Sequence, residues 1–251
     1  MSFTYRPPKA DVLKRRADGD YGDTRADIID SGIPLWKPGE GQHRIRILPA
    51  TWEGAEYYGY PIDVHYGVGD DGDRFVCPRQ FGDTCAICAA RFAAFDEGDR
   101  EYAKTLFPTR RVLYWIIDRD AANPQPLLWV APATKIDREI AAQAFDDTTG
   151  ELLLIDNPDS GYDVVFSKSG QGIATQWTGV KIARRPSPIH TDPAVQSRIL
   201  EYIAEHPLPS CVVRPDPDAV ARAFGTQARS AAQGGEEVAA PQDDIDDDIP
   251  F

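Results

Sequence analysis

The stretch that decides the fold is Gly41–Pro49, which reads GQHRIRILP. Its polar and apolar residues alternate, as they do in a β-strand that has one buried face. Arg44 and Arg46 would share one face of this strand, and Ile45 and Ile47 would share the other. The stretch therefore predicts a strand with an apolar side on a core and a basic side in solvent.

A second strand is predicted at residues 110–118, RRVLYWIID, which is too apolar on both faces to lie at the edge of a sheet. Shorter strands are expected where β-branched and aromatic residues are bounded by turn residues. They cover 127–130, 150–156, 162–168 and 173–182. Helices are expected after capping residues or prolines and in Ala-rich stretches. They cover 86–95, 99–107, 133–145 and 193–205.

Short strands with helices between them suit a small barrel. We predict a mainly β fold with α insertions, in which an OB-fold-type small barrel at residues 31–225 carries an inserted subdomain at about 60–107. Residues 1–30 would form a flexible basic arm, and residues 226–251 a disordered acidic tail. The arm carries the basic cluster Lys14, Arg15 and Arg16.

Three of the four cysteines stand near one histidine in the pattern H-x11-C-x7-C-x2-C, formed by His65, Cys77, Cys85 and Cys88. Thiolates and neutral imidazole are the ligands that zinc prefers, and four protein ligands leave no open position for catalysis. The spacing therefore predicts one structural zinc ion.

Other interpretations of these residues remain open. Cys85 and Cys88 could form a redox pair, although no thioredoxin-like context surrounds them. They could also be packed core thiols, which is the role expected of Cys211. The remaining histidines, at positions 43, 190 and 206, compete with His65 as fourth ligand.

Taken for the whole chain, the formal net charge of −13 argues against nucleic acid as a ligand. The charge is, however, unevenly distributed along the chain. Residues 236–251 carry seven acidic residues and no basic one, so residues 1–235 have a net charge of −6. Any basic surface must therefore be local.

Cations and aromatic residues alternate along several parts of the chain, as a surface for unpaired bases requires. Phosphates need positive charge, and bases stack on flat rings in a way that tolerates any sequence. For a single aromatic residue, packing in the core remains an alternative, as a salt-bridged surface does for the arginines. The candidates for DNA contact are Arg44, Arg46, Tyr57, Tyr58, Tyr60, Arg74, Arg79, Arg110, Arg111, Trp115, Trp177, Lys181 and Arg184.

The tail ends in Asp246, Asp247, Asp248, Ile249, Pro250 and Phe251. Acidic residues followed by an apolar pair suit capture by a hydrophobic pocket with a basic rim, although a merely solubilising tail would also be acidic. This ending resembles the C-terminal tip of bacterial single-stranded-DNA-binding proteins, which implies recruitment of replication, recombination or repair proteins.

The chain as a whole resembles the zinc-containing, helix-destabilising single-stranded-DNA-binding proteins of T-even-like tailed phages. The resemblance rests on residues 41–49, on the cysteine–histidine spacing, on Arg110–Trp115, on residues 161–180 and on the acidic tail. It implies an OB-fold core with a zinc subdomain, a basic arm for cooperative binding and an acidic tail for partners. Two features depart from the family. The basic cluster is followed by Ala17 and Asp18 instead of Ser or Thr, and the tip is of the bacterial kind.

We therefore expect sequence-independent binding and protection of single-stranded DNA during phage replication, recombination and repair, in the cytoplasm of the bacterial host. Self-association along DNA is also expected. A zinc-stabilised adaptor that binds protein or RNA in a replisome or transcription complex is the alternative. An enzyme is not expected, because no metal-nuclease carboxylate pattern, phosphate-binding glycine loop or nucleophile motif is present. No apolar run is long enough to cross a bilayer.

Overall fold

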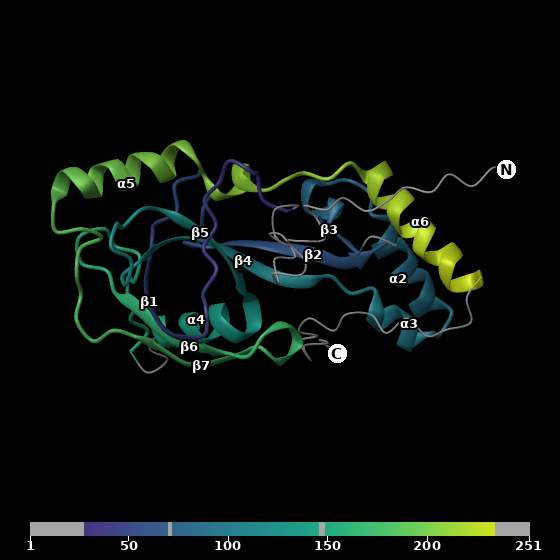
Figure 1. Ribbon diagram of the computed structural model, residues 1–251, viewed down its shortest axis with the longest axis horizontal. Helices are drawn as coiled ribbons and strands as arrows, with labels where there is room; N and C mark the ends of the chain where they lie inside the picture. Colours follow the sequence, from purple (N-terminus) through teal and green to yellow (C-terminus); the bar gives the residue numbers. More distant parts are fainter. Residues whose placement is uncertain (1–27, 70–71, 146–148, 234–251) are drawn as a thin grey trace, which may run out of the picture.

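The computed structural model describes residues 28–69, 72–145 and 149–233 (Figure 1). Strands and helices alternate along the chain in a mainly β arrangement. The strands are β1 (Gly41–Ile47), β2 (Tyr60–Val68), β3 (Asp73–Val76), β4 (Thr109–Asp118), β5 (Leu127–Pro132), β6 (Asp163–Ser169) and β7 (Gln176–Ile182). The α-helices are α2 (Ala86–Asp96), α3 (Arg100–Thr105), α4 (Arg138–Ala144), α5 (Pro193–Glu205) and α6 (Pro217–Gln233). Short helical turns are η1 (Pro78–Phe81), η2 (Ala133–Asp137), η3 (Gly172–Ala174) and η4 (Leu208–Cys211).

β4 is the centre of one antiparallel sheet in the order β3-β2-β4-β1-β6-β7, with β5 paired to β4 outside that path. β2 pairs with residues 109–113 of β4, β1 pairs with residues 116–118, and β5 pairs with residues 111–116. β4 is therefore paired along both of its edges, and residues 112–117 are buried on both faces of the strand. The prediction of a central strand at residues 110–118 is confirmed.

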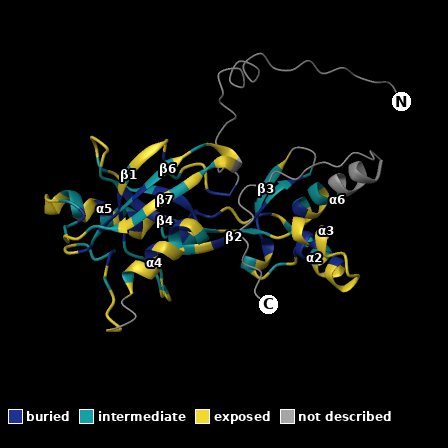
Figure 2. Ribbon diagram, turned by 90° about the horizontal axis from the view of Figure 1, so that it is seen from below, coloured by how far each residue is buried: buried dark blue, intermediate teal, exposed yellow. Residues whose placement is uncertain are grey.

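The two faces of β4 belong to two different hydrophobic cores. Leu113, Trp115 and Ile117 lie in the core that α5 covers, while Tyr114 and Ile116 lie in the core that α4 covers. This is the period-2 pattern of a strand buried on both sides. Figure 2 shows the buried residues concentrated in the strands.

The fold class is confirmed as mainly β with α insertions, but the sheet is not closed by strand pairing within the described ranges. η2 and α4 lie between β5 and β7, where strand pairing would have closed a barrel. The Gln143 side chain of α4 donates to the Val180 carbonyl (2.7 Å) and accepts from the Ile182 amide (3.2 Å). These hydrogen bonds occupy backbone groups of the edge strand β7 that could otherwise pair with another strand.

The basic face predicted for residues 41–49 exists only in its first half. Arg44 is exposed, whereas Arg46 is fully buried beside Asp163 of β6. Burial lowers the pKa of Arg46 to about 10, although the Asp163 carboxylate opposes this shift. A guanidinium in this position cannot reach a phosphate.

Three predicted boundaries or elements were wrong. Residues 150–156 form no strand, and only Leu152 makes a bridge, with Phe145. The core begins before residue 31, because Ile28 and Ile29 are buried and Ile29 bridges to Val212. Helix α6 was not expected and continues beyond residue 225, where the predicted tail begins.

Helices α2, α3 and α6 gather with β3 at one end of the molecule, and β2 and β4 run into this end from the main sheet (Figures 1 and 2). Val220 of α6 is buried against Ile87 and Cys88 of α2. The region expected at about residues 60–107 therefore packs against a helix from residues 217–233. None of the described helices is long and apolar enough to span a membrane.

Candidate metal centre and nucleic-acid interface

The four predicted ligands converge from four adjacent pieces of structure. His65 lies on β2, Cys77 follows β3, Cys85 is the N-cap of α2, and Cys88 lies in the first turn of that helix. All four side chains are buried. The cluster therefore connects β2, the end of β3 and the start of α2 at one point.

The distances within the cluster fit a single ion. His65 Nε2 lies 3.5 Å from Cys85 Sγ and 3.6 Å from Cys88 Sγ, and Cys77 Sγ lies 3.6 Å from Cys88 Sγ. All four donor atoms lie within 4.8 Å of one another. A tetrahedral ion with metal–sulfur bonds of about 2.3 Å would separate its sulfur ligands by about 3.8 Å. The cluster could therefore hold one metal ion.

The cysteine and histidine side chains of the cluster shift one another's pKa values. Hydrogen bonds from Cys77 and Cys88 are the largest causes that hold the pKa of the Cys85 thiol far below its ordinary value. Burial lowers the pKa of His65, but the hydrogen bonds to Cys85 and Cys88 outweigh it and raise that pKa to about 9. A group of thiols that favours a thiolate is suited to a cation.

The competing histidines lie elsewhere. His43 Nε2 contacts the Gly39 carbonyl (2.9 Å), and His206 Nδ1 contacts the Tyr202 carbonyl (2.9 Å). His190 contacts the backbone of Asp192. Cys211 is a buried thiol in the core under α5, as expected, and the four cysteines form no disulfide.

Two of the predicted DNA contacts are contradicted by burial. Arg46 is fully buried in its ion pair with Asp163, and Trp115 is 1% exposed. Trp115 Nε1 donates to the His206 carbonyl at 2.8 Å. Neither side chain is available to nucleic acid in this conformation, so we remove both from the candidate interface.

Tyr57 and Tyr58 are half-buried and pack together, with ring centroids 4.2 Å apart. The Tyr57 hydroxyl lies 2.8 Å from that of Tyr114, and both hydroxyls donate to Asp137. Burial is the largest cause that raises the pKa of Tyr57 far above its ordinary value. These contacts place the pair at the edge of the core under α4.

A different aromatic ring, that of Tyr66, is combined with cations in the way that the sequence predicted for a surface that binds unpaired bases. Tyr66, at the end of β2 near the metal cluster, lies under two guanidinium groups, 5.8 Å from that of Arg74 and 5.5 Å from that of Arg111. Arg111 Nε also donates to the Tyr66 hydroxyl at 3.3 Å. Next to Arg111, Arg110 is exposed and pairs with Asp63 at 3.3 Å. Arg110 and Arg111 are consecutive in β4, so their side chains lie on opposite faces of the strand. We call Tyr66, Arg74 and Arg111 the β2–β4 surface.

Tyr60 lies on β2 as well. It is half-buried and contacts the Trp52 ring edge to face, with centroids 6.0 Å apart. Tyr60 and Tyr66 both pack against the core under α5. Arg79 lies elsewhere, with its guanidinium 5.1 Å from the centre of the Phe92 ring on α2.

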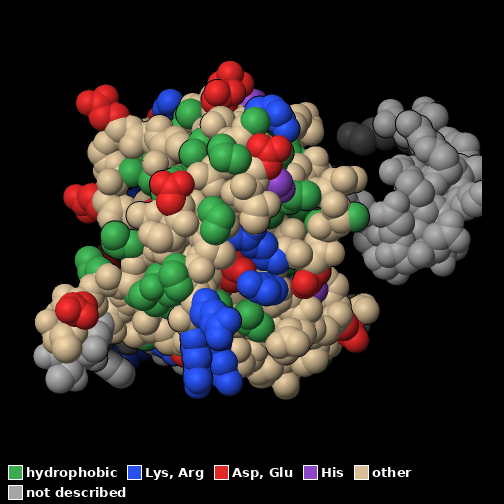
Figure 3. Space-filling model, turned by 90° about the vertical axis from the view of Figure 1, so that its left-hand side faces the viewer, with side chains coloured by type: hydrophobic (Ala, Val, Ile, Leu, Met, Phe, Trp, Pro, Cys, Tyr) green, Lys and Arg blue, Asp and Glu red, His purple; other side chains and the backbone are tan. Residues whose placement is uncertain are grey.

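The remaining predicted cations lie on β1, on β7 and just after it. Arg44, Val165 and Lys181 are neighbours across β1, β6 and β7, and both cations are exposed on the same face of the sheet. Arg184 is exposed beyond the end of β7. Figure 3, which faces the end of the molecule opposite the metal cluster, shows Lys and Arg side chains gathered together. Trp177 is instead half-buried against Trp129 and Phe166.

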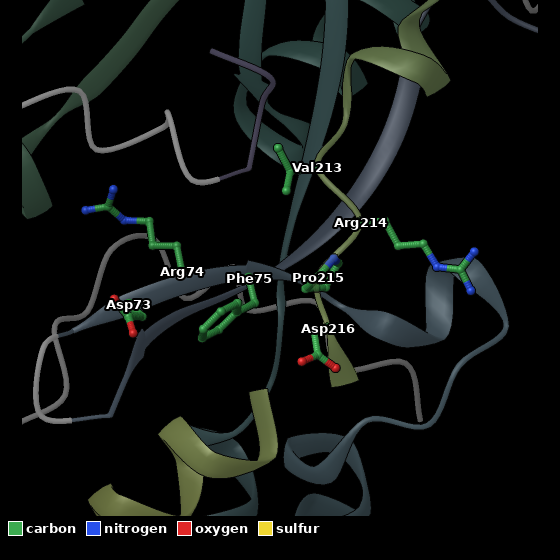
Figure 4. A pocket seen from close by; sticks show the side chains of 7 residues that line it. All are labelled: Asp73, Arg74, Phe75, Val213, Arg214, Pro215 and Asp216. Atoms are coloured by element: carbon green, nitrogen blue, oxygen red, sulfur yellow. The ribbon is translucent and has the colours of Figure 1, made fainter. Parts of the chain in front are cut away.

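A cleft of about 400 Å³ lies between β3 and residues 213–216. Figure 4 shows Arg74 and Arg214 pointing away from each other on its two sides, with Phe75 and Asp216 between them and Asp73 on the side of Arg74. Arg214 is already paired with Asp83 at 2.8 Å. The cleft therefore does not bring two cations to one anion.

Sequence analysis missed several residues. Tyr66 was not among the candidates for DNA contact, and Arg91, Phe92 and Phe107 were not considered. The helical spacing of Arg91, Phe92 and Phe95 was the available signal, because residues three and four apart share one helix face. The arm residues 14–16 and the tip residues 246–251 lie outside the described ranges.

No model of a known protein family matches the chain, and no curated protein matches it either.

Proposed function

We propose that the chain binds single-stranded DNA without sequence preference and without catalysis, on a sheet held by one structural zinc ion. The observation that carries the proposal is the β2–β4 surface, where the Tyr66 ring lies 5.8 Å and 5.5 Å from the guanidinium groups of Arg74 and Arg111. A ring with guanidinium groups held over it combines a flat surface for a base with charge for its phosphate.

Zinc is the ion that the donor set favours. Three thiols and one imidazole, all buried and converging, match the chemistry of closed structural zinc sites. With four protein ligands, such an ion has no position for water or substrate. Its role would be to hold β2 and β3 against α2, next to the β2–β4 surface.

The tail supports a second part of the proposal, which is recruitment of partner proteins. Residues 246–251 combine three carboxylates with two apolar side chains. This chemistry fits a hydrophobic site with a basic rim on a partner. The resemblance to phage and bacterial single-stranded-DNA-binding proteins favours a role in phage DNA replication, recombination and repair.

Substitutions at Tyr66 and Arg74 test the interface. Tyr66→Leu should weaken oligo-dT binding by about 1–3 kcal/mol, or about 5- to 150-fold, because it removes the stacking ring. Tyr66→Phe keeps the ring and should bind almost as wild type does. Arg74→Ala should lower the salt dependence of log K by about one phosphate contact. Fluorescence anisotropy of a labelled oligo-dT measures all three.

Arg198→Ala is the matched control, because Arg198 is an exposed cation on α5, away from this surface. Zinc content and circular dichroism establish that each variant is folded. If Tyr66→Leu and Arg74→Ala both bind as the control does, the β2–β4 surface is not the interface. If the wild-type chain also does not bind oligo-dT, a zinc-stabilised adaptor that binds protein or RNA becomes the better proposal.

A further inference from the structure

An exposed aromatic cluster lies on the helices beside the metal centre. Phe92, Phe95 and Phe107 are 45%, 39% and 41% exposed. The rings of Phe95 and Phe107 meet edge to face, with centroids 5.9 Å apart. Figure 2 shows exposed residues along α2 and α3 at this end of the molecule. Exposed apolar side chains that gather in this way mark a site of interaction.

Two cations lie over the same rings. The Arg91 guanidinium is 4.7 Å from the centre of Phe92 and 4.5 Å from that of Phe107, and Arg79 is 5.1 Å from Phe92. Neither arginine has a carboxylate within 4.0 Å in the described part of the chain, and Arg91 Nε is buried there without a hydrogen-bond partner. We call Arg79, Arg91, Phe92, Phe95 and Phe107 the aromatic–arginine patch.

Helix α6 brings the C-terminal part of the chain to this end of the molecule. It packs on α2 through Val220, with Ala223 and Phe224 beside it, and the two helices lie side by side in Figure 1. The helix ends at Gln233, sixteen residues before Ile249. A flexible segment of this length has a root-mean-square reach of about 20–25 Å. Residues 246–251 are therefore tethered within reach of α2 and α3.

The chemistry of those residues is complementary to the patch. Asp246, Asp247 and Asp248 supply carboxylates for the two arginines, and Ile249 and Phe251 supply apolar side chains for the phenylalanine rings. We propose that residues 246–251 bind the aromatic–arginine patch of the same chain. A partner that binds the tail must then compete with the patch. The proposal is independent of DNA binding, because neither the patch nor the tail needs nucleic acid for this contact.

A labelled peptide of residues 240–251 measures the site in the full-length protein. The double variant Ile249→Ser/Phe251→Ser has a disabled tail and an open patch, so the peptide should bind it. The wild-type chain should bind the peptide at least about tenfold more weakly, because its own tail competes at an effective concentration in the millimolar range. A peptide with the same two serine substitutions keeps its charge and should bind neither protein.

Substitutions in the double variant locate the site. Arg91→Ala and Phe92→Ser should each weaken peptide binding by about tenfold or more, as expected for central residues of a small interface. Leu152→Ser is the matched control, because Leu152 is 67% exposed and lies outside the patch. Asp96→Asn should strengthen binding, because Asp96 is one helical turn from Phe92 and repels an acidic segment.

Three results would overturn the proposal. The first is no binding of the peptide to the double variant, and the second is equal binding to the double variant and the wild type. The third is peptide binding that Arg91→Ala and Phe92→Ser leave unchanged. A wild-type dimer in light scattering that becomes a monomer in the double variant would place the tail on a second copy, which also contradicts binding within one chain.

Discussion

Asp163 is the residue on which the junction of β1, β4 and β6 depends. Its carboxylate is 1% exposed and contacts three guanidinium groups, those of Arg44 (2.7 Å), Arg46 (3.4 Å) and Arg119 (3.0 Å). Arg119 also donates to the carbonyls of Pro188 and Ile189, which ties the segment before α5 to the sheet. A buried carboxylate with three cationic partners cannot be removed without leaving charge uncompensated.

Replacing Asp163 by Asn should lower the free energy of unfolding by about 3–5 kcal/mol, because the fully buried Arg46 loses its counter-charge. Glu53→Gln, at an exposed acidic position, should change it by less than about 0.5 kcal/mol. Urea unfolding followed by fluorescence measures both variants. Equal unfolding midpoints for the two would show that the cluster contributes little to stability.

The sequence of β1 could not reveal this pairing. Alternation placed Arg46 with Arg44 on a basic face, and the two do share a face of the strand. The partner Asp163 is 117 residues away in the chain, and the segment that covers Arg46 includes Ser187. Only the tertiary fold brings these groups together, and burial by a distant loop cannot be deduced from local alternation.

At the scale of helices and strands, the sequence predicted an element well where the local pattern of residues was enough to determine its structure. β4 and α5 were predicted closely, because one is continuously apolar and the other begins with Asp192 as N-cap and Pro193 in the first turn. The strand expected at residues 150–156 failed because strands need partners. Ile155 is buried in the core under α4, but Leu152 and Leu154 are 67% and 58% exposed without a ladder beside them.

Helix α6 was missed although a signal was present. Asp216 Oδ1 accepts a hydrogen bond from the Asp218 amide at 3.0 Å, and Pro217 opens the helix. This is the arrangement of a capped N-terminus. The convergence of His65, Cys77, Cys85 and Cys88 on one site that could hold a metal ion, by contrast, was predictable, because cysteine spacing and a nearby histidine are typical of metal ligands.

Removal of the metal should destabilise helices α2, α3 and α6 more than the central strand β4. Cys77, Cys85 and Cys88 make up half of the buried cluster that joins α2 to α6, so loss of the ion removes much of what holds this end. A chelator should expose α2, α3 and α6 to hydrogen exchange while β4 stays protected. Elemental analysis should find one zinc per chain in the wild type and in Cys211→Ala, and less in Cys88→Ser. Equal zinc in all three would contradict the assignment of ligands.

At the scale of the whole molecule, function depends on where charge lies. The chain has a net charge of −13, yet exposed or half-buried cations gather on the β2–β4 surface and around Arg44, Lys181 and Arg184. The acidic residues of the last sixteen positions account for seven negative charges. A protein that is anionic overall can therefore still present local positive surfaces to a phosphate backbone.

The most direct test of this account is the binding of a labelled oligo-dT, compared with a duplex of the same length, at low ionic strength and with increasing salt. We predict saturable binding to oligo-dT and far weaker binding to the duplex. Log K should fall linearly with log salt, by about 0.7 for each phosphate contact. The absence of oligo-dT binding at low salt would contradict the account, provided that it persists when the acidic residues of 236–248 are replaced by their amides.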